Sequence, residues 1–361
     1  RSFDFTSSYP AVMCSEMFPM SSPEHVVLKS KEEFLENLEN YCCMFDVEFS
    51  QLESRIEYEH PLSKSKCATI EGYIEDNGRI VYADRAVTSL TELDYKTFSK
   101  FYKWKNCRIF NFRRFKKGYL PKDLILSVLK FYGDKTKLKG VEGKEVEYLN
   151  SKENANSTYG MMVTDICRDE IVYTDEWGTM PADIDEIISR YNKSRNRFLY
   201  YPWGVWITAY ARYNLFSGIL AFGNDYVYSD TDSIKVRNYK KHIKYIQFYN
   251  KVIKYKLDMC LSHYGIPTEL TAPKTIKGVT KQLGEWDDEG MYSRFKTLGA
   301  KRYMTEKDGK ISLTVAGLNK HVAIPYLLDK FGDRIFENFT DELYVPPEHT
   351  GKLTHTYLDY E

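Results

Sequence analysis

The sequence predicts an α+β fold whose sheets are mainly antiparallel. Long helical patterns and strand patterns both occur, and the strands follow one another at hairpin spacing rather than at the wider spacing of βαβ units. The chain has 361 residues, of which 43% are hydrophobic and 15% aromatic. It can therefore bury a sizeable core and divide into two or more lobes.

The first third of the chain begins with a short strand and a helix. Residues 2–7 alternate phenylalanine with polar side chains, which is the pattern of a strand. Pro10 then opens a predicted helix, with Ser7 and Ser8 placed to cap it. Residues 27–100 combine a helical pattern with several strand patterns, so a self-contained α+β insertion is expected there.

Helices dominate the middle of the chain. Residues 120–132 and 142–160 are two long helical patterns separated by the turn GDKTKLKG, which predicts an αα-hairpin. A second, smaller insertion covers about 161–201, and the apolar stretch after it predicts a buried helix. A strand hairpin, a helix over 239–265, further strands to about residue 304 and a small separate lobe complete the expected order.

Composition narrows the class of protein. No stretch of about 18 uninterrupted apolar residues occurs, so no transmembrane helix is expected. There is no signal-peptide pattern and no initiator Met, and the chain is interpreted as a fragment whose natural beginning lies upstream. The seven cysteines show no CxxC pair and no metal-ligand spacing, which favours free thiols in a reducing cytoplasm.

Charge gives only a weak indication of a partner. The 51 Lys and Arg residues balance 51 Asp and Glu residues, so no net positive charge points to nucleic acid. Basic clusters interleaved with aromatic residues, such as 110–118 and 239–256, hint at a channel that follows phosphates. Each cluster alone is more typical of a solvated surface.

Two acids stand at a turn in the segment YVYSDTDSIKV. Asp230 and Asp232 are expected at the apex of a tight β-hairpin, where a lone DTD is typical of an ordinary polar turn. Asp4 lies in another predicted strand, and if the two strands are neighbours, Asp4 and Asp232 could share a cation. Mg²⁺ prefers one or two carboxylates plus substrate phosphates. Two such ions, about 4 Å apart, would stabilise the attacking and the leaving oxygens of a phosphoryl transfer.

The helix predicted over 142–160 carries a polar stripe along one face. Its members, at i, i+4, i+8, i+12 and i+15, are Lys144, Tyr148, Lys152, Asn156 and Tyr159. A lysine stripe is usually solvated, but this one continues into an amide, an aromatic ring and Gly160, where a backbone or a base pair could approach closely. Lysines on such a face could hold a triphosphate and offset charge on a leaving group.

Five short motifs resemble those of family B DNA polymerases, and they occur along the chain in the order that the family has. DFTSSYP, KENANSTYG and YSDTDS resemble motifs A, B and C, while TAYAR and KRY resemble the template-binding and KxY motifs. The insertions after motifs A and B, and VAGLNK before the tail, resemble the protein-primed branch found in phages and linear plasmids. The resemblance covers nearly the whole chain and implies a right-hand polymerase fold with an antiparallel palm sheet, αα-hairpin fingers, a small thumb and two insertions.

The resemblance implies a role for each matching residue. The catalytic set would be Asp4, Asp230 and Asp232, with the metal held by Asp4, Asp232 and the carbonyl of Phe5. The implied nucleotide contacts are the N–H groups of Ser7 and Ser8, the steric-gate ring of Tyr9, the triphosphate lysine Lys152 with Lys144 or a lysine of the 135–139 loop assisting, and Asn156 and Tyr159 at the nascent base pair. The implied DNA contacts are Thr208 and Arg212 on the template, Lys301 and Tyr303 at the primer end, and Gly160.

The resemblance also implies a division of the chain. The expected parts are a palm in 1–26 and 202–304, a first insertion in 27–107, fingers in 108–160, a second insertion in 161–201 and a truncated thumb in 305–361. The first insertion is of the type that contacts a priming protein and DNA, and the second is of the type that gives strand displacement and processivity. Three features depart from the family: Ser8 stands where Leu is usual, Thr158 varies a position that the motif leaves open, and an N-terminal exonuclease domain is expected to be missing from the chain.

The function implied is that of a DNA-directed DNA polymerase of viral or plasmid replication. Its cofactor would be two Mg²⁺ ions, and Mn²⁺ suits the same oxygen ligands. Its partners would be template–primer DNA, dNTPs and a terminal priming protein, and we expect a monomer in the cytoplasm of a bacterial host with no membrane partner. Two alternatives stay open: a non-catalytic DNA-binding remnant or inactive fragment, and a metal-dependent nuclease. The retained carboxylates disfavour the first, and the lack of a DxE pair or a histidine cluster disfavours the second.

Overall fold

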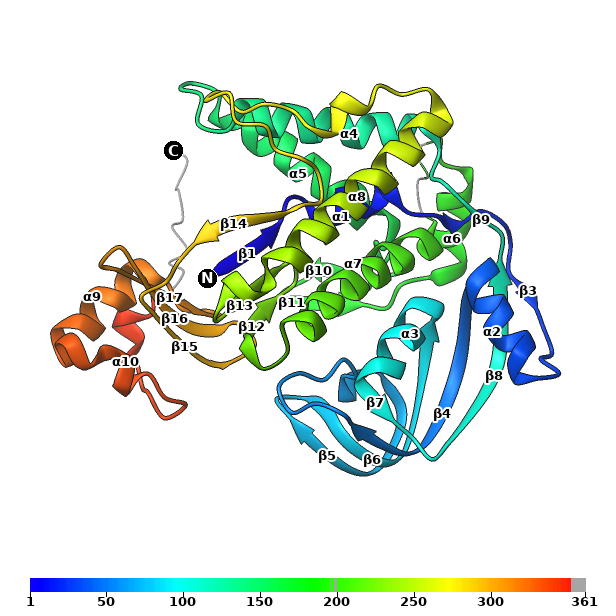
Figure 1. The fold of residues 1–361 in the computed structure, drawn as a ribbon, viewed down its shortest axis with the longest axis horizontal. Coiled ribbons are helices and arrows are strands. Elements are labelled where there is room, and N and C mark those ends of the chain that lie inside the picture. The colour runs from blue at the N-terminus through cyan, green and yellow to red at the C-terminus, as the bar shows by residue number, and fades with distance from the viewer. Residues whose placement is uncertain (196, 198–199, 352–361) are drawn as a thin grey trace.

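A four-stranded antiparallel sheet lies at the centre of the molecule. The computed structural model describes residues 1–195, 197 and 200–351, and Figure 1 shows their arrangement. The strands of the central sheet, in the spatial order β12-β13-β1-β14, are β12 (Tyr226–Asp230), β13 (Ser233–Val236), β1 (Ser2–Phe5) and β14 (Trp286–Gly290). The sheet therefore brings the beginning of the chain beside segments more than 200 residues later. Its pairings are antiparallel, as the sequence predicts.

The two faces of this sheet carry different side chains. The long helices α7 (Tyr201–Phe222) and α8 (Ile243–Tyr264) cover one face, where Phe3 and Phe5 are 4% and 2% exposed. Because side chains alternate along a strand, Asp4 between these two rings points to the opposite face. Burial of the two phenylalanines thus decides the direction of the carboxylate.

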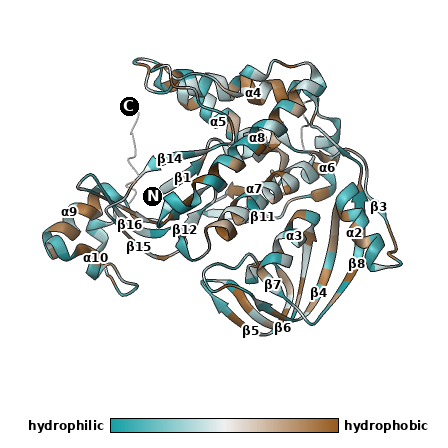
Figure 2. Ribbon diagram, in the orientation of Figure 1, coloured by the Kyte–Doolittle hydropathy of each residue, from teal (hydrophilic) through white to brown (hydrophobic). Residues whose placement is uncertain are grey.

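A larger sheet with two helices follows β1 and its helix, in agreement with the predicted α+β insertion. It consists of β3 (Glu24–His25), β8 (Asn106–Phe115), β4 (Cys42–Ser54), β6 (Arg79–Thr91) and β5 (Cys67–Asp76), with β7 (Tyr102–Lys103) paired to β4. The helices are α2 (Lys31–Asn40) and α3 (Glu92–Phe101), and Figure 2 shows apolar stretches along β4 and β8. Since β8 is one strand, the division expected at 107/108 falls inside it.

The predicted helical hairpin is present with different bounds. It consists of α4 (Lys122–Leu138) and α5 (Glu145–Met162), which pack on each other and on α1 (Ser8–Ser15). The first helix was expected to end at 132, but it continues through Gly133 because Tyr132 and Thr136 on either side are buried. That packing outweighs the cost of about 1 kcal/mol for a glycine inside a helix. The lysines of the expected 135–139 loop therefore lie on or at the end of α4.

Two smaller corrections concern helix starts. The helix predicted from Pro10 begins at Ser8, and Ser7 has a left-handed backbone (φ 59) with no capping hydrogen bond from its side chain. The helix predicted over 239–265 begins as a 3₁₀ turn, Tyr239–His242, before α8. It ends at Gly265 (φ 62), the usual left-handed terminator.

The second insertion and the final lobe complete the fold. The second insertion consists of β10 (Glu170–Tyr173), β11 (Trp177–Met180) and α6 (Ile184–Lys193). Outside it, β2 (Phe18–Pro19) pairs with β9 (Lys117–Gly118). The final lobe contains β15 (Arg294–Gly299), β16 (Arg302–Lys307), β17 (Lys310–Val315), α9 (Lys320–Phe331) and α10 (Ile335–Asn338) around its own core. The boundary expected at 304/305 falls inside β16, so the KRY motif belongs to this lobe. Residues 352–361 of the expected thumb lie outside the described residues.

The structure also bears on membrane-spanning helices and on the state of the cysteines. Within the described residues, no helix has both the length and the apolar character needed to cross a bilayer. All seven cysteines are free thiols, as expected.

Candidate active site

Strand pairing brings Asp4 and Asp232 together. Asp4 pairs with Ser233 across β1 and β13, and the N–H of Phe5 donates to the carbonyl oxygen of Asp232 at 2.8 Å. The predicted hairpin is present, with Thr231 and Asp232 as its two turn residues between β12 and β13. Thr231 has φ 53, a rare conformation for a β-branched residue, so the turn is held in a strained geometry.

The two carboxylates lie in an electrostatically unfavourable place. Burial and the charge of Asp232 raise the pKa of Asp4 to about 7. Burial and the charge of Asp230 also raise the pKa of Asp232. Acids that share a half-buried site resist ionisation together, so this end of the sheet has a negative potential that a cation would relieve.

The third acid of the predicted set has a different environment. Asp230 accepts hydrogen bonds from Nζ of Lys301 on both carboxylate oxygens, each at 3.1 Å. The backbone N–H of Lys301 in turn donates to the hydroxyl of Tyr228 at 2.9 Å. Asp230 is thus compensated by a lysine of the final lobe, whereas Asp4 and Asp232 face a cavity.

That cavity, of about 450 Å³, collects most of the predicted nucleotide-binding residues. Its lining includes Asp4, Phe5, Ser7, Ser8, Tyr9, Lys135, Lys152, Asn156, Tyr159 and Asp232. The side chains come from β1, the start of α1, the α4–α5 hairpin and the β12–β13 turn. A cavity lined by both carboxylates and lysines offers ligands for a metal ion and for the phosphates of a polyphosphate.

The N-terminus of α1 faces this cavity. The first N–H groups of a helix have no partner within the helix, and the dipole adds positive potential there. The side chain of Ser7 does not cap the helix, and its hydroxyl accepts a hydrogen bond from Nζ of Lys135 at 2.8 Å. The unpaired N–H groups and the lysine therefore form a site suited to an anion.

Lys135 and Lys152 form the cationic part of the cavity. Burial lowers the pKa of Lys135, and the neighbouring charges of Lys152 and Lys139 lower it further. Two like charges held this close favour an anionic ligand between them. Lys144, which shares the predicted stripe, does not line the cavity and instead pairs with Glu147 at 2.7 Å.

Two tyrosines form one wall. The rings of Tyr9 and Tyr159 lie 4.6 Å apart, centroid to centroid, at an interplanar angle of 44°. Asn156 is exposed one helical turn before Tyr159 and lines the same cavity. An aromatic pair beside an amide suits contact with a sugar and a base.

The predicted DNA-binding residues are not among the residues that line the cavity. Thr208 and Arg212 lie on α7, where the Thr208 hydroxyl donates to the Val205 carbonyl at 2.9 Å and Arg212 pairs with Asp94. A Cβ on Gly160 would meet no atom within 4 Å, so the space beside α5 is open at this glycine. Tyr303 packs between Tyr228 and Phe295 in the final lobe.

The sequence reading missed a buried lysine beside the acids. Lys235 is 8% exposed on the same sheet face as Asp4, and its Nζ donates to the Ser233 hydroxyl at 2.9 Å. Burial lowers its pKa, while the carboxylates of Glu289, Asp4 and Asp232 oppose that shift. The available signal was its position between the buried Ile234 and Val236, which puts it on the same strand face as Ser233.

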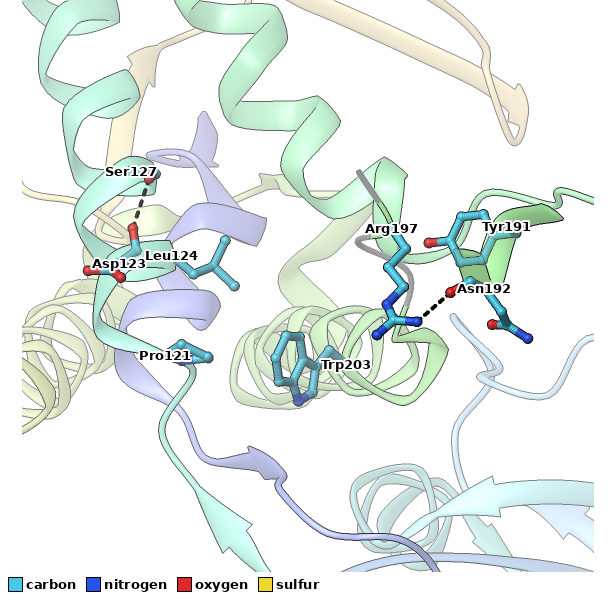
Figure 3. A pocket seen from close by; sticks show the side chains of 8 residues that line it. All are labelled: Pro121, Asp123, Leu124, Ser127, Tyr191, Asn192, Arg197 and Trp203. Atoms are coloured by element: carbon cyan, nitrogen blue, oxygen red, sulfur yellow. Dashed lines mark hydrogen bonds between the residues drawn. The ribbon is translucent and has the colours of Figure 1, made fainter. Parts of the chain in front are cut away.

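A second cavity, of about 700 Å³, lies away from the acids. Figure 3 shows it between the start of α4, the end of α6 and Trp203 of α7. Arg197 donates from Nη1 to the carbonyl of Asn192 at 2.6 Å, and Ser127 donates to its own helix at the carbonyl of Asp123. It is larger than the first cavity but is lined by a single carboxylate, so the paired-acid chemistry belongs to the first.

The acids at the first cavity fit a magnesium site that substrate would complete. In the described part of the chain, no three His, Cys, Asp or Glu side chains form a group that could hold a metal ion. Two carboxylates without a third ligand do not form a closed cage. They are the set that Mg²⁺ uses when substrate phosphates supply the remaining oxygens.

Comparisons with known proteins identify the fold. The chain is 24% identical over 322 residues to the DNA polymerase of Bacillus phage phi29, a match that covers 86% of the chain and 46% of the relative. The polymerase of Bacillus phage PZA matches to the same extent. The solved phi29 DNA polymerase complexed with primer–template DNA and incoming nucleotides aligns with 94% of the chain and 52% of its own, at a TM-score of 0.61 and 20% identity. At these identities the comparisons show the fold, which is that of the phi29 DNA polymerase. No protein-family model matches the chain.

The predicted right-hand polymerase fold is thereby confirmed. The orthorhombic crystal form of phi29 polymerase gives a TM-score of 0.57 at 20% identity, again over 94% of the chain. The chain spans about half of the length of these polymerases.

Proposed function

We propose that this chain is the polymerase part of a template-dependent DNA polymerase, which adds dNTPs to a primer 3′-OH in phage or plasmid replication within a bacterial cell. The observation that most supports this is that Asp4 and Asp232 line the same cavity as Lys135 and Lys152. The phi29 structure named above holds primer–template DNA and incoming nucleotides, which are the ligands proposed here.

The nucleotide would lie between the acids and the lysines. Lys152 and Lys135 bind the triphosphate together with the N–H groups of Ser7 and Ser8 at the helix terminus. Tyr9, packed on Tyr159, lies under the sugar and leaves no room for a ribose 2′-OH. Tyr159 and Asn156 face the nascent base pair.

Catalysis would depend on charged side chains that line the cavity in fixed positions. Asp4, Asp232 and the carbonyl of Phe5 hold the metal, with Asp230 as a supporting acid. When bound, a pair of Mg²⁺ ions (or Mn²⁺) supplies stabilisation of the attacking 3′-oxygen and of the leaving pyrophosphate. Lys135 and Lys152 offset the negative charge that develops on the pyrophosphate, and need no reorganisation to do so.

The remaining elements would hold DNA. Gly160, Thr208 and Arg212 contact the template, and Lys301 and Tyr303 contact the primer end. The central sheet with α1, α7 and α8 is the palm, α4 and α5 are the fingers, and the lobe from β15 onwards is the thumb. The insertion at 27–107 contacts a priming protein, and the insertion at 161–201 encircles DNA. The chain acts as a monomer.

Primer extension on a short template–primer with Mg²⁺ and dNTPs tests the proposal. Asp232→Asn removes one metal charge without adding bulk, so extension should fall at least about a hundredfold. Asp76→Asn, an exposed acid on β5, is the matched control and should extend like wild type. Equal extension by Asp232→Asn and wild type would contradict the metal site. DNA binding without extension by wild type would instead favour the non-catalytic remnant.

A further inference from the structure

Two carboxylates at the start of α3 hold the helix that carries the proposed template contacts. Glu92 accepts a hydrogen bond from Nε1 of Trp206 at 2.9 Å, and Asp94 pairs with Arg212, with Trp206 and Arg212 both on α7. Helix α3 belongs to the insertion at 27–107, and α7 belongs to the central part of the fold. The insertion is thus joined to α7 by two side-chain contacts, Glu92 to Trp206 and Asp94 to Arg212.

The side chain of Asp94 is held by hydrogen bonds that do not involve Arg212. Thr91 and Asp94 form a capping box: the Thr91 hydroxyl donates to Asp94 Oδ2 at 2.9 Å, and the N–H of Asp94 donates back to that hydroxyl at 3.2 Å. The Asp94 side chain is 16% exposed, whereas Arg212 is 46% exposed. The more buried carboxylate, held by Thr91, therefore gives the longer and more exposed guanidinium a fixed partner.

The pair occupies only one edge of the guanidinium. Asp94 accepts from Nε at 3.1 Å and from Nη2 at 2.9 and 3.0 Å. Among the described residues, Nη1 of Arg212 has no hydrogen-bond acceptor, so its two hydrogens stay available. The charge of Arg212 also opposes the burial that raises the pKa of Tyr9 and Tyr159. The guanidinium therefore lies within electrostatic reach of the nucleotide cavity.

We propose that Asp94 is a positioning residue, which holds Nε and Nη2 of Arg212 so that Nη1 points to the template strand. The insertion then forms part of the template site rather than only an attachment surface. This inference rests on the proposed function, because it assigns a template contact to Arg212. Glu92 and buried Trp206 supply the packing of α3 on α7, and the half-exposed ion pair adds little stability of its own.

Charge and position predict opposite effects when Asp94 is removed. Loss of a carboxylate near a DNA site should strengthen DNA binding if charge alone mattered, because DNA is an anion. If Asp94 positions Arg212, its loss should weaken binding instead. The sign of the change therefore separates the two explanations.

The test is a double-mutant cycle on the dissociation constant of a fluorescent template–primer with a 5′ template overhang, measured by anisotropy. Asp94→Ala and Arg212→Ala should each weaken binding about five- to tenfold, and the double variant should bind no more weakly than either. Both should reduce the salt dependence of binding by about one counterion. Thr91→Ala removes the hydroxyl that holds Asp94 but leaves the ion pair, so it should weaken binding less than Asp94→Ala does.

Three results would overturn the inference: unchanged or tighter binding by Asp94→Ala, multiplied losses in the double variant, or an equal loss in Thr91→Ala. The readout requires no catalysis. A wild-type chain that binds but does not extend therefore contradicts the proposed function while the cycle still decides the role of Asp94. A wild-type chain that does not bind template–primer contradicts both.

Discussion

Nζ of Lys301 donates to both carboxylate oxygens of Asp230, at 3.1 Å each. This contact separates the three acids of the candidate site into two kinds. Asp230 has a cationic partner, whereas Asp4 has a pKa raised to about 7 by burial and by the charge of Asp232. The sheet therefore stores unfavourable energy at Asp4 and Asp232 that it does not store at Asp230.

Asp4→Asn should stabilise the metal-free protein at pH 8. The folded pKa of Asp4 lies above its ordinary value of 3.8, so the folded state binds more protons than the unfolded state between about pH 4 and pH 7. The contribution of this group to stability is present below that window and is lost as the pH rises through it. The variant should gain about 1–2 kcal/mol in the free energy of unfolding, since partial exposure screens the full shift.

Urea denaturation in EDTA at pH 5 and pH 8 measures this difference. Asp230→Asn is the matched control and should change stability by less than about 1 kcal/mol, because an exposed ion pair contributes little. Added Mg²⁺ should stabilise wild type and reduce the advantage of Asp4→Asn. A variant less stable than wild type at pH 8 would show that Asp4 is not strained in the folded state.

Lys135→Met should weaken nucleotide binding selectively. Nζ of Lys135 lies in the cavity beside the Ser7 hydroxyl, where a charge-assisted contact to phosphate is worth about 1.5–3 kcal/mol. We expect the KM for dNTP to rise roughly tenfold or more in single-nucleotide incorporation, with the dissociation constant for template–primer unchanged. Lys130→Met removes an exposed lysine of the same helix, paired with Asp134, and should stay within twofold of wild type. Equal effects of the two variants would contradict a triphosphate contact by Lys135.

Sequence patterns predicted the strand and the hairpin that carry the acids, because these signals are local. The alternation of residues 2–7 predicted the strand of Asp4, and the turn residues around Asp232 predicted the hairpin. What the alternation could not give was that β1 pairs with β13, since no local pattern encodes a pairing across more than 200 residues. The structure shows this pairing directly, in the hydrogen-bond register between β1 and β13.

The lysines were predicted less well. Periodicity places Lys144 and Lys152 on one helix face, but eight residues correspond to about 12 Å along the axis, so one end of the stripe lies outside the cavity. Lys135 was expected in a loop, because Gly133 resembles a helix end until the packing of Tyr132 is known. Asp94 has no sequence signal beyond its capping box, because its partner lies 118 residues away.

Glu92→Gln should remove a pH dependence from the stability of the fold. Glu92 is 1% exposed and accepts hydrogen bonds from the N–H of Cys43 and from Nε1 of Trp206. Burial raises its pKa to about 7, although both donors favour the ionised form. Because the folded pKa lies above the ordinary value of 4.5, this group stabilises the fold at low pH and loses that contribution as the pH rises towards about 7 and beyond.

Glutamine imitates the neutral acid at every pH, so the stability difference between the variant and wild type should grow with pH. We expect a gain on the order of 2–3 kcal/mol at pH 8 and little difference at pH 5, measured by urea denaturation. Glu53→Gln, an exposed acid on β4 paired with Lys103, should give a flat difference over the same range. A Glu92→Gln variant that loses stability relative to wild type as the pH rises would mean that the folded protein holds Glu92 as a carboxylate. The hydrogen bonds from Cys43 and Trp206 would then outweigh its burial.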